Sequence, residues 1–488
     1  MTISSRGMGV RSDSAMVATG HPLAAHAAKD MLASGGSAID AAIAADAILG
    51  VVEPMATGIG GDLLAMLVEP DGRAISYNGT GRSPKALSLD VVEKLPNQRI
   101  PERHALSVTV PGAVRGWFDL HARYGRLPMA KLLAPAIALA AEGFAVLPIT
   151  AREWAVFEPV IRLDPACAEL YRAGGTPQAG DQFANPLLAA VLRAIATEGP
   201  DAFYLGDPAR HAAAANQARG GVLSADDFAA HRGDFTVPLE RQFRGLKVLE
   251  CPPNTHGVAV LDALEELDGL ALDRNDPTTT LAMVEAVGRA MAQAQKTVAD
   301  PAGNTVCTVV VDRDGLAVTL MSSVFKRFGS GIAVPGGGFV LQNRGFGFSE
   351  PGHINGPGPA KRPYHTVVPG AALKDGHFYA GFGVVGGAMQ PQGHVQLLVR
   401  LAAWGEDLQS AIDAPRWRLE GAKALAIEPG TPDTIAKALR AAGYTDPVGA
   451  GELAGRSDFG GAQFVLRAED GSLHGGSDKR KDGVALGA

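Results

Sequence analysis

The sequence predicts an α+β protein in which helices cover antiparallel sheets. Two observations lead to this prediction. Apolar residues recur at helical spacing over 22–52, over 112–145 and through most of 180–300, whereas strand-like runs dominate after Asn304. Those later strands lack the regular alternation with helices that a doubly wound parallel sheet requires, so antiparallel pairing is favoured.

Helical patterns prevail in the first 300 residues. Residues 22–52 are rich in alanine, the best helix former, and Gly35-Gly36 divides them into two helices, the second opening at Ser37. The segment 63–79 predicts two strands around a Pro-Asp-Gly turn. Residues 112–145 predict helix with an interruption at YGRLP, and within 180–300 only FRGLKVLECPP predicts a strand.

After Asn304, strand-like patterns replace most of the helical ones. The sequence predicts a helix over 392–404 and strands over 305–311, 315–321, 338–342, 366–373 and 378–384. Glycine clusters separate these runs. Because glycine tolerates positive φ and close approach of the backbone, we expect tight turns or close contacts at GIGGD (58–62), PGGG (335–338), GFGF (345–348) and GVVGGAMQPQG (383–393).

Composition excludes several classes of function. The net charge of −7 is spread along 488 residues without a basic block, which argues against nucleic-acid binding. No run of about 18 apolar residues predicts a membrane span, and the first residues lack a secretory signal pattern, so we expect a cytoplasmic protein. The three cysteines are far apart and predict buried thiols rather than disulfides or a zinc knuckle.

The stretch GNTVCTVVVDRDG (303–315) places Thr305 where a polar turn becomes an apolar strand. Taken alone, this is an ordinary strand start, because Asn and Gly favour turns and Thr and Val favour strands. Motifs elsewhere in the sequence indicate a second role for this position.

Several stretches together resemble the γ-glutamyltransferase family of N-terminal-nucleophile hydrolases. The resemblance runs from residue 8 to about 420 and is specific as a set. It rests on HPLAAHAAKDMLASGGSAIDAAIAADAILGVVEPMATGIGGD, VPGAVRGWFDLHARYGRLPMAKLLAPAIALAAEGF, FGSGIAVPGGGFVLQNRGFGFS, PAKRPYHTVVP, GVVGG and LQSAIDAPRW, in that order.

This resemblance implies a four-layer αββα sandwich and a proenzyme that cuts itself between Asn304 and Thr305. The products would be a large chain, 1–304, and a small chain, 305–488, which together form one structural domain. The resemblance further implies a small-molecule amide substrate and neither cofactor nor metal. Assembly beyond the two chains stays open.

The resemblance also assigns the catalytic roles. Thr305 becomes the nucleophile, the backbone N–H groups of Gly386 and Gly387 bind the oxyanion, and Ser323 supports the nucleophile's amine. The chemistry explains the position of Thr305: a free hydroxyl needs a base, and a newly released α-amine with a pKa near ~8 can serve. Nucleophile and base then belong to one residue.

Departures from the family pattern fall on substrate recognition. Thr80 matches the family's Arg, with Arg82 two residues further on as a substitute. Phe325 replaces an Asn, Gly347 replaces an acid, and His365-Thr366 replace a pair of Ser. Loss of the acid removes the partner of a substrate ammonium, whereas positive charge suits an anionic substrate. The candidate cations are Arg82, Arg344, Lys361 and Arg362.

Two substrate classes therefore remain. The expected reaction is the family activity, γ-glutamyl transfer or glutathione hydrolysis. The alternative is hydrolysis of a small non-glutamyl amide, because QNRG, KRPYHT and GGAMQPQ resemble a subgroup that includes oxamate amidohydrolase. A catalytically silent relative is an alternative, because Val306 and the short link AQAQKTVADPAGN before Thr305 depart from the self-cleaving pattern. A metal hydrolase is another, and its candidate ligands are His21, His26, His256 and His365, without a recognised ligand spacing.

Overall fold

The computed structural model describes residues 9–172, 174–298, 304–447 and 459–488. Two seven-stranded sheets form its centre, and the neighbouring strands in both pair antiparallel. The first sheet has the order β18 (Val484–Gly487), β2 (Met16–Thr19), β10 (Asn304–Val311), β11 (Ala317–Phe325), β3 (Asp62–Val68), β4 (Ala74–Asn78), β7 (Asp234–Thr236). The second has the order β1 (Val10–Ser12), β17 (Leu473–Ser477), β16 (Ala462–Arg467), β13 (His377–Val384), β12 (Gly370–Lys374), β9 (Leu246–Glu250), β8 (Leu239–Phe243).

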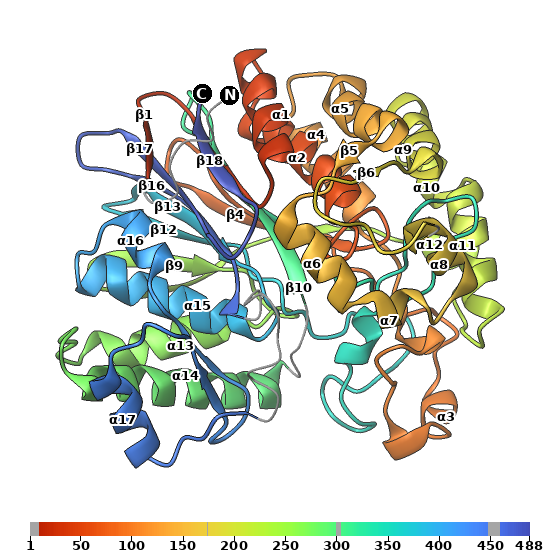
Figure 1. The fold of residues 1–488 in the computed structure, drawn as a ribbon. Coiled ribbons are helices and arrows are strands. Elements are labelled where there is room, and N and C mark those ends of the chain that lie inside the picture. The colour runs from red at the N-terminus through yellow and green to blue at the C-terminus, as the bar shows by residue number, and fades with distance from the viewer. Residues whose placement is uncertain (1–8, 173, 299–303, 448–458) are drawn as a thin grey trace.

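Helices cover the outer face of each sheet (Figure 1). The helices up to α12 form one group, in which α1, α2 and α4 contact strands of the first sheet: α1 (Pro22–Ala33), α2 (Ala38–Val52), α3 (Leu89–Val92), α4 (Ala113–Tyr124), α5 (Met129–Glu142), α6 (Pro148–Val156), α7 (Glu158–Ile161), α8 (Pro165–Arg172), α9 (Pro186–Glu198), α10 (Asp201–Tyr204), α11 (Asp207–Gln217) and α12 (Ala225–Ala229). The other group lies with the second sheet: α13 (Gly257–Asp268), α14 (Pro277–Thr297), α15 (Met389–Leu398), α16 (Leu408–Asp413) and α17 (Asp433–Ala441). Two small hairpins complete the strands: β5 (Phe144–Ala145) with β6 (Gln182–Phe183), and β14 (Trp417–Leu419) with β15 (Leu425–Ile427).

Three apolar cores separate the four layers. One lies between α1, α2, α5, α9 and the first sheet, and a second lies between α13, α14, α15 and the second sheet. A third, between the two sheets, includes Met66, Cys251, Cys307 and Val465. The αββα expectation is therefore confirmed, and burial of these side chains is the main favourable term in folding.

Local sequence signals explain the first elements. Ser37 begins α2 with a reciprocal capping box, in which its side chain accepts from the backbone N–H of Asp40 and the Asp40 carboxylate accepts from the N–H of Ser37. Gly35, with a φ of 85°, ends the preceding helix as predicted. The predicted helices in 112–145 and the hairpin in 63–79 are confirmed as well.

Other expectations were wrong in part. The predicted strand 338–342 joins neither sheet, because its backbone pairs with a loop: Leu341 N–H donates to Ile332 O at 2.9 Å, and Gln342 N–H donates to Gly60 O at 2.9 Å. The helix expected at 392–404 begins earlier, at Met389, and the short strands β7 and β8 were missed in a region read as helical. The strand expected over 366–373 begins only at Gly370.

Segments before and after Thr305 share both sheets. In the first sheet, β10 lies between β2 and β11, and β11 in turn pairs with β3. The division into 1–304 and 305–488 itself stays a prediction. Of the link 292–304, residues 299–303 lie outside the described residues. No helix within the described ranges is both long and apolar enough to cross a bilayer.

Candidate active site

Thr305 lies at the start of β10 and is fully buried. The pairing of β10 with β11 shifts register between Asn304↔Phe325 and Val306↔Ser322, so Thr305 stands opposite a bulge. Because side chains alternate along a strand, Thr305 shares its face with Cys307, which lies in the core between the sheets. The hydroxyl therefore points into the space between the two sheets.

The Thr305 hydroxyl contacts α15. The Gln390 side-chain amide, in the first turn of α15, donates from Nε2 to Thr305 Oγ1 at 2.9 Å. Ser323, in the bulge opposite Thr305, is also fully buried, and its hydroxyl oxygen accepts from the N–H of Phe325 at 2.9 Å and from Arg344 at 3.2 Å.

Arg344 links several predicted site residues. Its guanidinium is buried, donates to Ser323 Oγ and to Thr366 Oγ1 at 3.1 Å, and lies 3.9 Å above the centre of the Phe325 ring. Burial lowers the pKa of Arg344 to about 9, against the attraction of Asp62, so the group stays charged at neutral pH. Phe325 adopts a φ of 77°, which is rare for a large side chain.

Asp62, the first residue of β3, is the negative charge in this cluster. Its Oδ1 accepts from Gly81 N–H at 2.7 Å and from Gln342 at 2.8 Å, and its Oδ2 lies 3.2 Å from His365 Nε2. Burial pushes the pKa of Asp62 upward, but the hydrogen bond from His365 and the charge of Arg344 together hold it below its usual value. The carboxylate is therefore ionised and surrounded by protein donors.

His365 is a neutral donor in this arrangement. Its Nδ1 accepts from the N–H of Val367 at 3.2 Å, which places the ring proton on Nε2, facing Asp62. Burial, followed by the charge of Arg344, lowers the pKa of His365 to about 4. At neutral pH the charged groups of this cluster are therefore Arg344 and Asp62, and His365 is neutral.

Gly386 and Gly387 connect β13 to the start of α15. Their φ values of 117° and 62° suit glycine, and no described residue accepts a hydrogen bond from either N–H group. The Gly386 and Gly387 carbonyls instead receive the N–H groups of Met389 and Gln390 in the first turn of α15. Two adjacent donors at the N-terminus of a helix are suited to stabilise a developing negative charge.

The remaining candidate cations lie apart from this cluster. Arg82 is exposed and donates to Ala360 O at 3.5 Å, and Lys361 bonds the carbonyls of Ile354 and Gly356 at 2.7 and 2.8 Å. Arg362 donates to Thr80 O and pairs with Asp234. The substrate contact assigned to Arg82 stays a prediction.

The position expected to hold an acid is closed by packing. A Cβ atom added to Gly347 would lie 2.9 Å from the carbonyl oxygen of Tyr364. A carboxylate side chain does not fit there unless the backbone moves.

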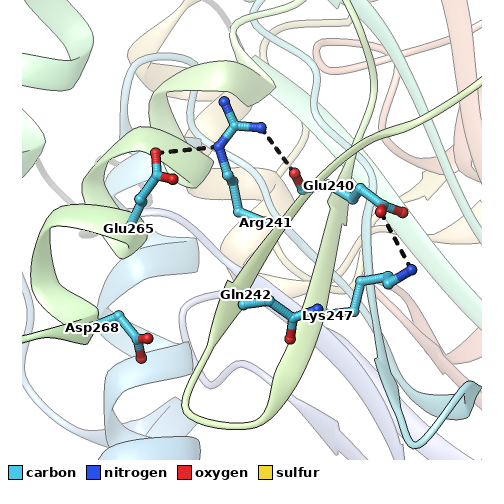
Figure 2. Close-up of a pocket in the computed structure, with 6 residues that line it drawn as sticks. All are labelled: Glu240, Arg241, Gln242, Lys247, Glu265 and Asp268. Atoms are coloured by element: carbon cyan, nitrogen blue, oxygen red, sulfur yellow. Dashed lines mark hydrogen bonds and ion pairs between the residues drawn. The ribbon is translucent and has the colours of Figure 1, made fainter.

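Two hollows in the surface lie elsewhere. A charged depression of about 360 Å³ lies beside the edge strand β8, where Arg241 pairs with Glu265 at 3.2 Å and Lys247 pairs with Glu240 at 3.3 Å (Figure 2). Such charges discourage a sheet edge from pairing with another chain. A larger hollow of about 760 Å³ is lined by residues between 166 and 187 and between 333 and 338. Thr305 lines neither hollow.

Two of the histidines considered as metal ligands are neighbours: the N–H of His256 donates to the carbonyl oxygen of His365 at 3.2 Å. His21 caps α1, and His256 hydrogen-bonds Thr366 O at 3.0 Å. Within the part of the chain that the structure describes, no group of three His, Cys, Asp or Glu side chains is placed to hold a metal ion.

Comparison with known proteins agrees with the geometry. The family model for gamma-glutamyltranspeptidase matches residues 24–308 and 301–488. The chain belongs to the γ-glutamyltranspeptidase family. It is therefore an enzyme, a hydrolase of the N-terminal-nucleophile type, as the resemblance implied.

Three relatives show where this chain lies within the family. It is 33% identical to the glutathione hydrolase-like YwrD proenzyme of Bacillus subtilis (97% of this chain, 98% of the relative). It is 34% identical to the oxamate amidohydrolase proenzyme of Klebsiella pneumoniae, over the same shares of both chains. Cephalosporin acylase from Bacillus halodurans has the same fold, with a TM-score of 0.93 and 35% identity over 100% of this chain and 98% of that one.

Sequence reasoning missed three residues of the cluster: Asp62, Gln342 and Gln390. Asp62 closes the GIGGD turn, and the other two lie in QNRG and GGAMQPQ, all of which were singled out as motifs. The available signal was a polar residue next to glycines that permit close approach.

Proposed function

We propose that this chain is a self-processing amide hydrolase that uses Thr305 as its nucleophile. The observation that carries the proposal is the position of the Thr305 hydroxyl: buried between the sheets, held by Gln390, and opposite Ser323. Cleavage of the Asn304–Thr305 bond would give chains of 304 and 184 residues and a free α-amine on Thr305.

The released amine then acts as general base for its own hydroxyl. Thr305 Oγ1 attacks the substrate carbonyl, the leaving amine departs with a proton, and water hydrolyses the acyl-threonine ester. In this proposal the N–H groups of Gly386 and Gly387 stabilise the oxyanion of each tetrahedral intermediate. Transfer to an acceptor amine in place of water is the variant reaction.

The charges favour an acyl group that carries a carboxylate and no ammonium. Arg344 and Lys326 both lie near the Phe325 ring, Lys326 at 5.8 Å from its centre. Asp62 is already surrounded by donors, and Gly347 leaves no room for an acid. A buried substrate ammonium would therefore lack a partner here. A small anionic amide of the oxamate kind fits this balance.

Hydrolysis of a γ-glutamyl amide such as glutathione is the second candidate. The family itself favours it, as does the 33% identity to a glutathione hydrolase-like proenzyme across nearly the whole chain. The three cysteines are free and buried, which supports the proposal that the enzyme works in the reducing cytoplasm.

The test of self-processing compares wild type with Thr305→Ala by denaturing electrophoresis and intact mass. We expect two fragments, split at Asn304–Thr305, in wild type and one chain in the variant. A single wild-type chain without amidase activity would mean a catalytically silent relative.

The substrate class is tested on the processed enzyme. Ammonia release from oxamate is compared with release of the anilide from a γ-glutamyl anilide at equal concentrations. We expect a higher kcat/KM for the ammonium-free substrate. Robust γ-glutamyl turnover would instead establish the second candidate.

A further inference from the structure

The side chain of Gln390 bridges two parts of the molecule. It lies fully buried in the first turn of α15, where Oε1 accepts from the N–H of Val368 at 3.0 Å and Nε2 donates to Thr305 Oγ1 at 2.9 Å. Both ends of the amide are therefore used, and one end touches the atom proposed to react.

Chemistry fixes the direction of this amide. The backbone N–H of Val368 can only donate, so the oxygen of the Gln390 amide must face it. The NH₂ group then faces Thr305, whose oxygen accepts. Because a donor occupies this side of the oxygen, the proton of the Thr305 hydroxyl must point in another direction.

The helix that carries Gln390 is held firmly. The Gln392 side chain bonds both backbone groups of Leu419. Its Nε2 donates to Leu419 O at 3.0 Å, and its Oε1 accepts from the N–H of Leu419 at 2.7 Å. One turn later, Gln396 does the same with Trp417, at 3.0 and 3.1 Å. These two amides attach α15 to β14 as a neighbouring strand would, and they fix the position of Gln390.

The same helix is tied to the strand that leads to Gly386. His394 Nε2 accepts from the N–H of Val384 at 3.2 Å, and its Nδ1 lies 2.8 Å from Glu250 Oε1. The hydroxyl of Thr305 and the two glycines of the proposed oxyanion site are therefore positioned by one element.

We propose that Gln390 is a catalytic residue whose N–H sets the polarity of the Thr305 hydroxyl, in self-cleavage as well as in turnover. This inference rests on the proposed function of Thr305. Hydrogen bonds from a fixed donor stabilise an oxygen on which negative charge develops.

Self-cleavage begins with an acyl shift from nitrogen to oxygen. Thr305 Oγ1 bonds to the carbonyl carbon of Asn304, the bond from that carbon to the Thr305 nitrogen breaks, and the hydroxyl proton ends on that nitrogen. Water then hydrolyses the ester, which leaves a carboxyl group on Asn304 and restores the hydroxyl. Gln390 keeps its own proton and stabilises Oγ1 when it attacks and again when it leaves the ester.

Gln390→Glu tests this role with little change in shape. The carboxylate still accepts from Val368 but presents a lone pair, in place of an N–H, to Thr305. Precursors made by cell-free synthesis are followed for cleavage between pH 5 and 9. Relative to wild type at each pH, we expect a loss on the order of 10²-fold at pH 8. The deficit should shrink at pH 5, where a protonated carboxyl can donate.

Gln396→Glu is the matched control, since it makes the same change on the same helix against the backbone of Trp417. We expect its cleavage to follow the wild-type pH profile, whatever its melting temperature. If Gln390→Glu does not fold, Gln390→Met decides, because it removes the donor and keeps the shape: it should cleave on the order of 10²-fold more slowly.

The inference is overturned if Gln390→Glu cleaves at wild-type rates with an unchanged pH profile. Wild-type rates of cleavage in Gln390→Met, where that variant is used in its place, would overturn it too. In either case, cleavage of wild type would still support the role of Thr305. If wild type itself is not cleaved, the proposed function fails instead.

Discussion

At the scale of single residues, Arg344 determines the charge of the site. It is one of several cations near the expected substrate positions, but it alone among the four candidates contacts Ser323 and Thr366. Its charge is balanced by Asp62, with Nε and Oδ2 4.0 Å apart. Because both groups are buried, each one depends on the other and on neutral hydrogen-bond partners.

Arg344→Gln should therefore weaken binding of an anionic substrate more than it slows the chemical step. A hydrogen bond to a charged group contributes roughly 1.5–3 kcal/mol, so we expect KM for oxamate to rise about 10- to 100-fold. Steady-state kinetics on processed enzyme measure this. Arg362→Gln, which changes a cation outside the cluster, should leave KM unchanged, and an equal rise in both variants would contradict the assignment.

At the scale of elements, the turn 58–62 decides how closely β3 approaches its neighbours. A Cβ on Gly61 would lie 2.5 Å from the carbonyl oxygen of Ser323, and one on Gly60 would collide with the carbonyl of Val340. These glycines allow the start of β3 to pack against β11 and the loop at 340. Asp62 is thereby brought to within reach of His365 and Arg344.

Gly61→Ala should push β11 away from β3 at Ser323. We expect slower self-cleavage, by an order of magnitude or more, together with a lower melting temperature, since overpacking costs roughly 1–3 kcal/mol. Gly269→Ala is the control, because nothing lies within 4 Å of a Cβ at that position. If both variants cleave at the wild-type rate, the close approach is not needed for processing.

At the scale of the whole molecule, the segments on either side of Thr305 are held together by more than shared sheets. Four buried charges join them: Arg327 lies 2.6 Å from Glu153, and Lys481 lies 3.3 Å from Glu53 and 3.6 Å from Glu153. The carboxylates precede Thr305 and the cations follow it. Chains cut at Thr305 would therefore remain associated.

Buried histidines make the folded molecule sensitive to acid. Burial lowers the pKa to about 4 in His21, His231 and His365, and to about 3 in His256 and His394. Between pH 6.5 and about 4 the unfolded chain therefore binds more protons than the folded one, and stability falls as pH falls. The cost at pH 5 is roughly 2 kcal/mol per histidine.

Four buried acids act in the opposite direction, because burial raises the pKa of Asp46 to about 6 and also raises the pKa of Glu53, Glu250 and Asp312. The histidines outnumber them. We expect the melting temperature of the Thr305→Ala precursor to fall by several degrees between pH 7 and pH 5, measured by calorimetry. A constant or rising melting temperature over that range would show that these histidines are not buried as neutral groups.

The local elements can be predicted from the sequence alone, and so can the chemistry proposed for Thr305. Alanine-rich periodicity, the Gly35-Gly36 break and the Ser37 cap define α1 and α2, because these signals act over a few residues. The position of Thr305 at the start of a strand and the family resemblance likewise came from short, ordered motifs.

Which polar residues meet depends on how the two sheets pack. Asp62 and His365, or Gln390 and Thr305, are separated by 303 and 85 residues and are joined through the packing of two sheets. The sequence alone did not show that Arg344, rather than Arg82, is buried beside Ser323, because the burial of a side chain depends on all the segments that pack around it. It also misplaced the strand at 338–342, because strand propensity does not tell whether a backbone pairs with a sheet or with a neighbouring loop.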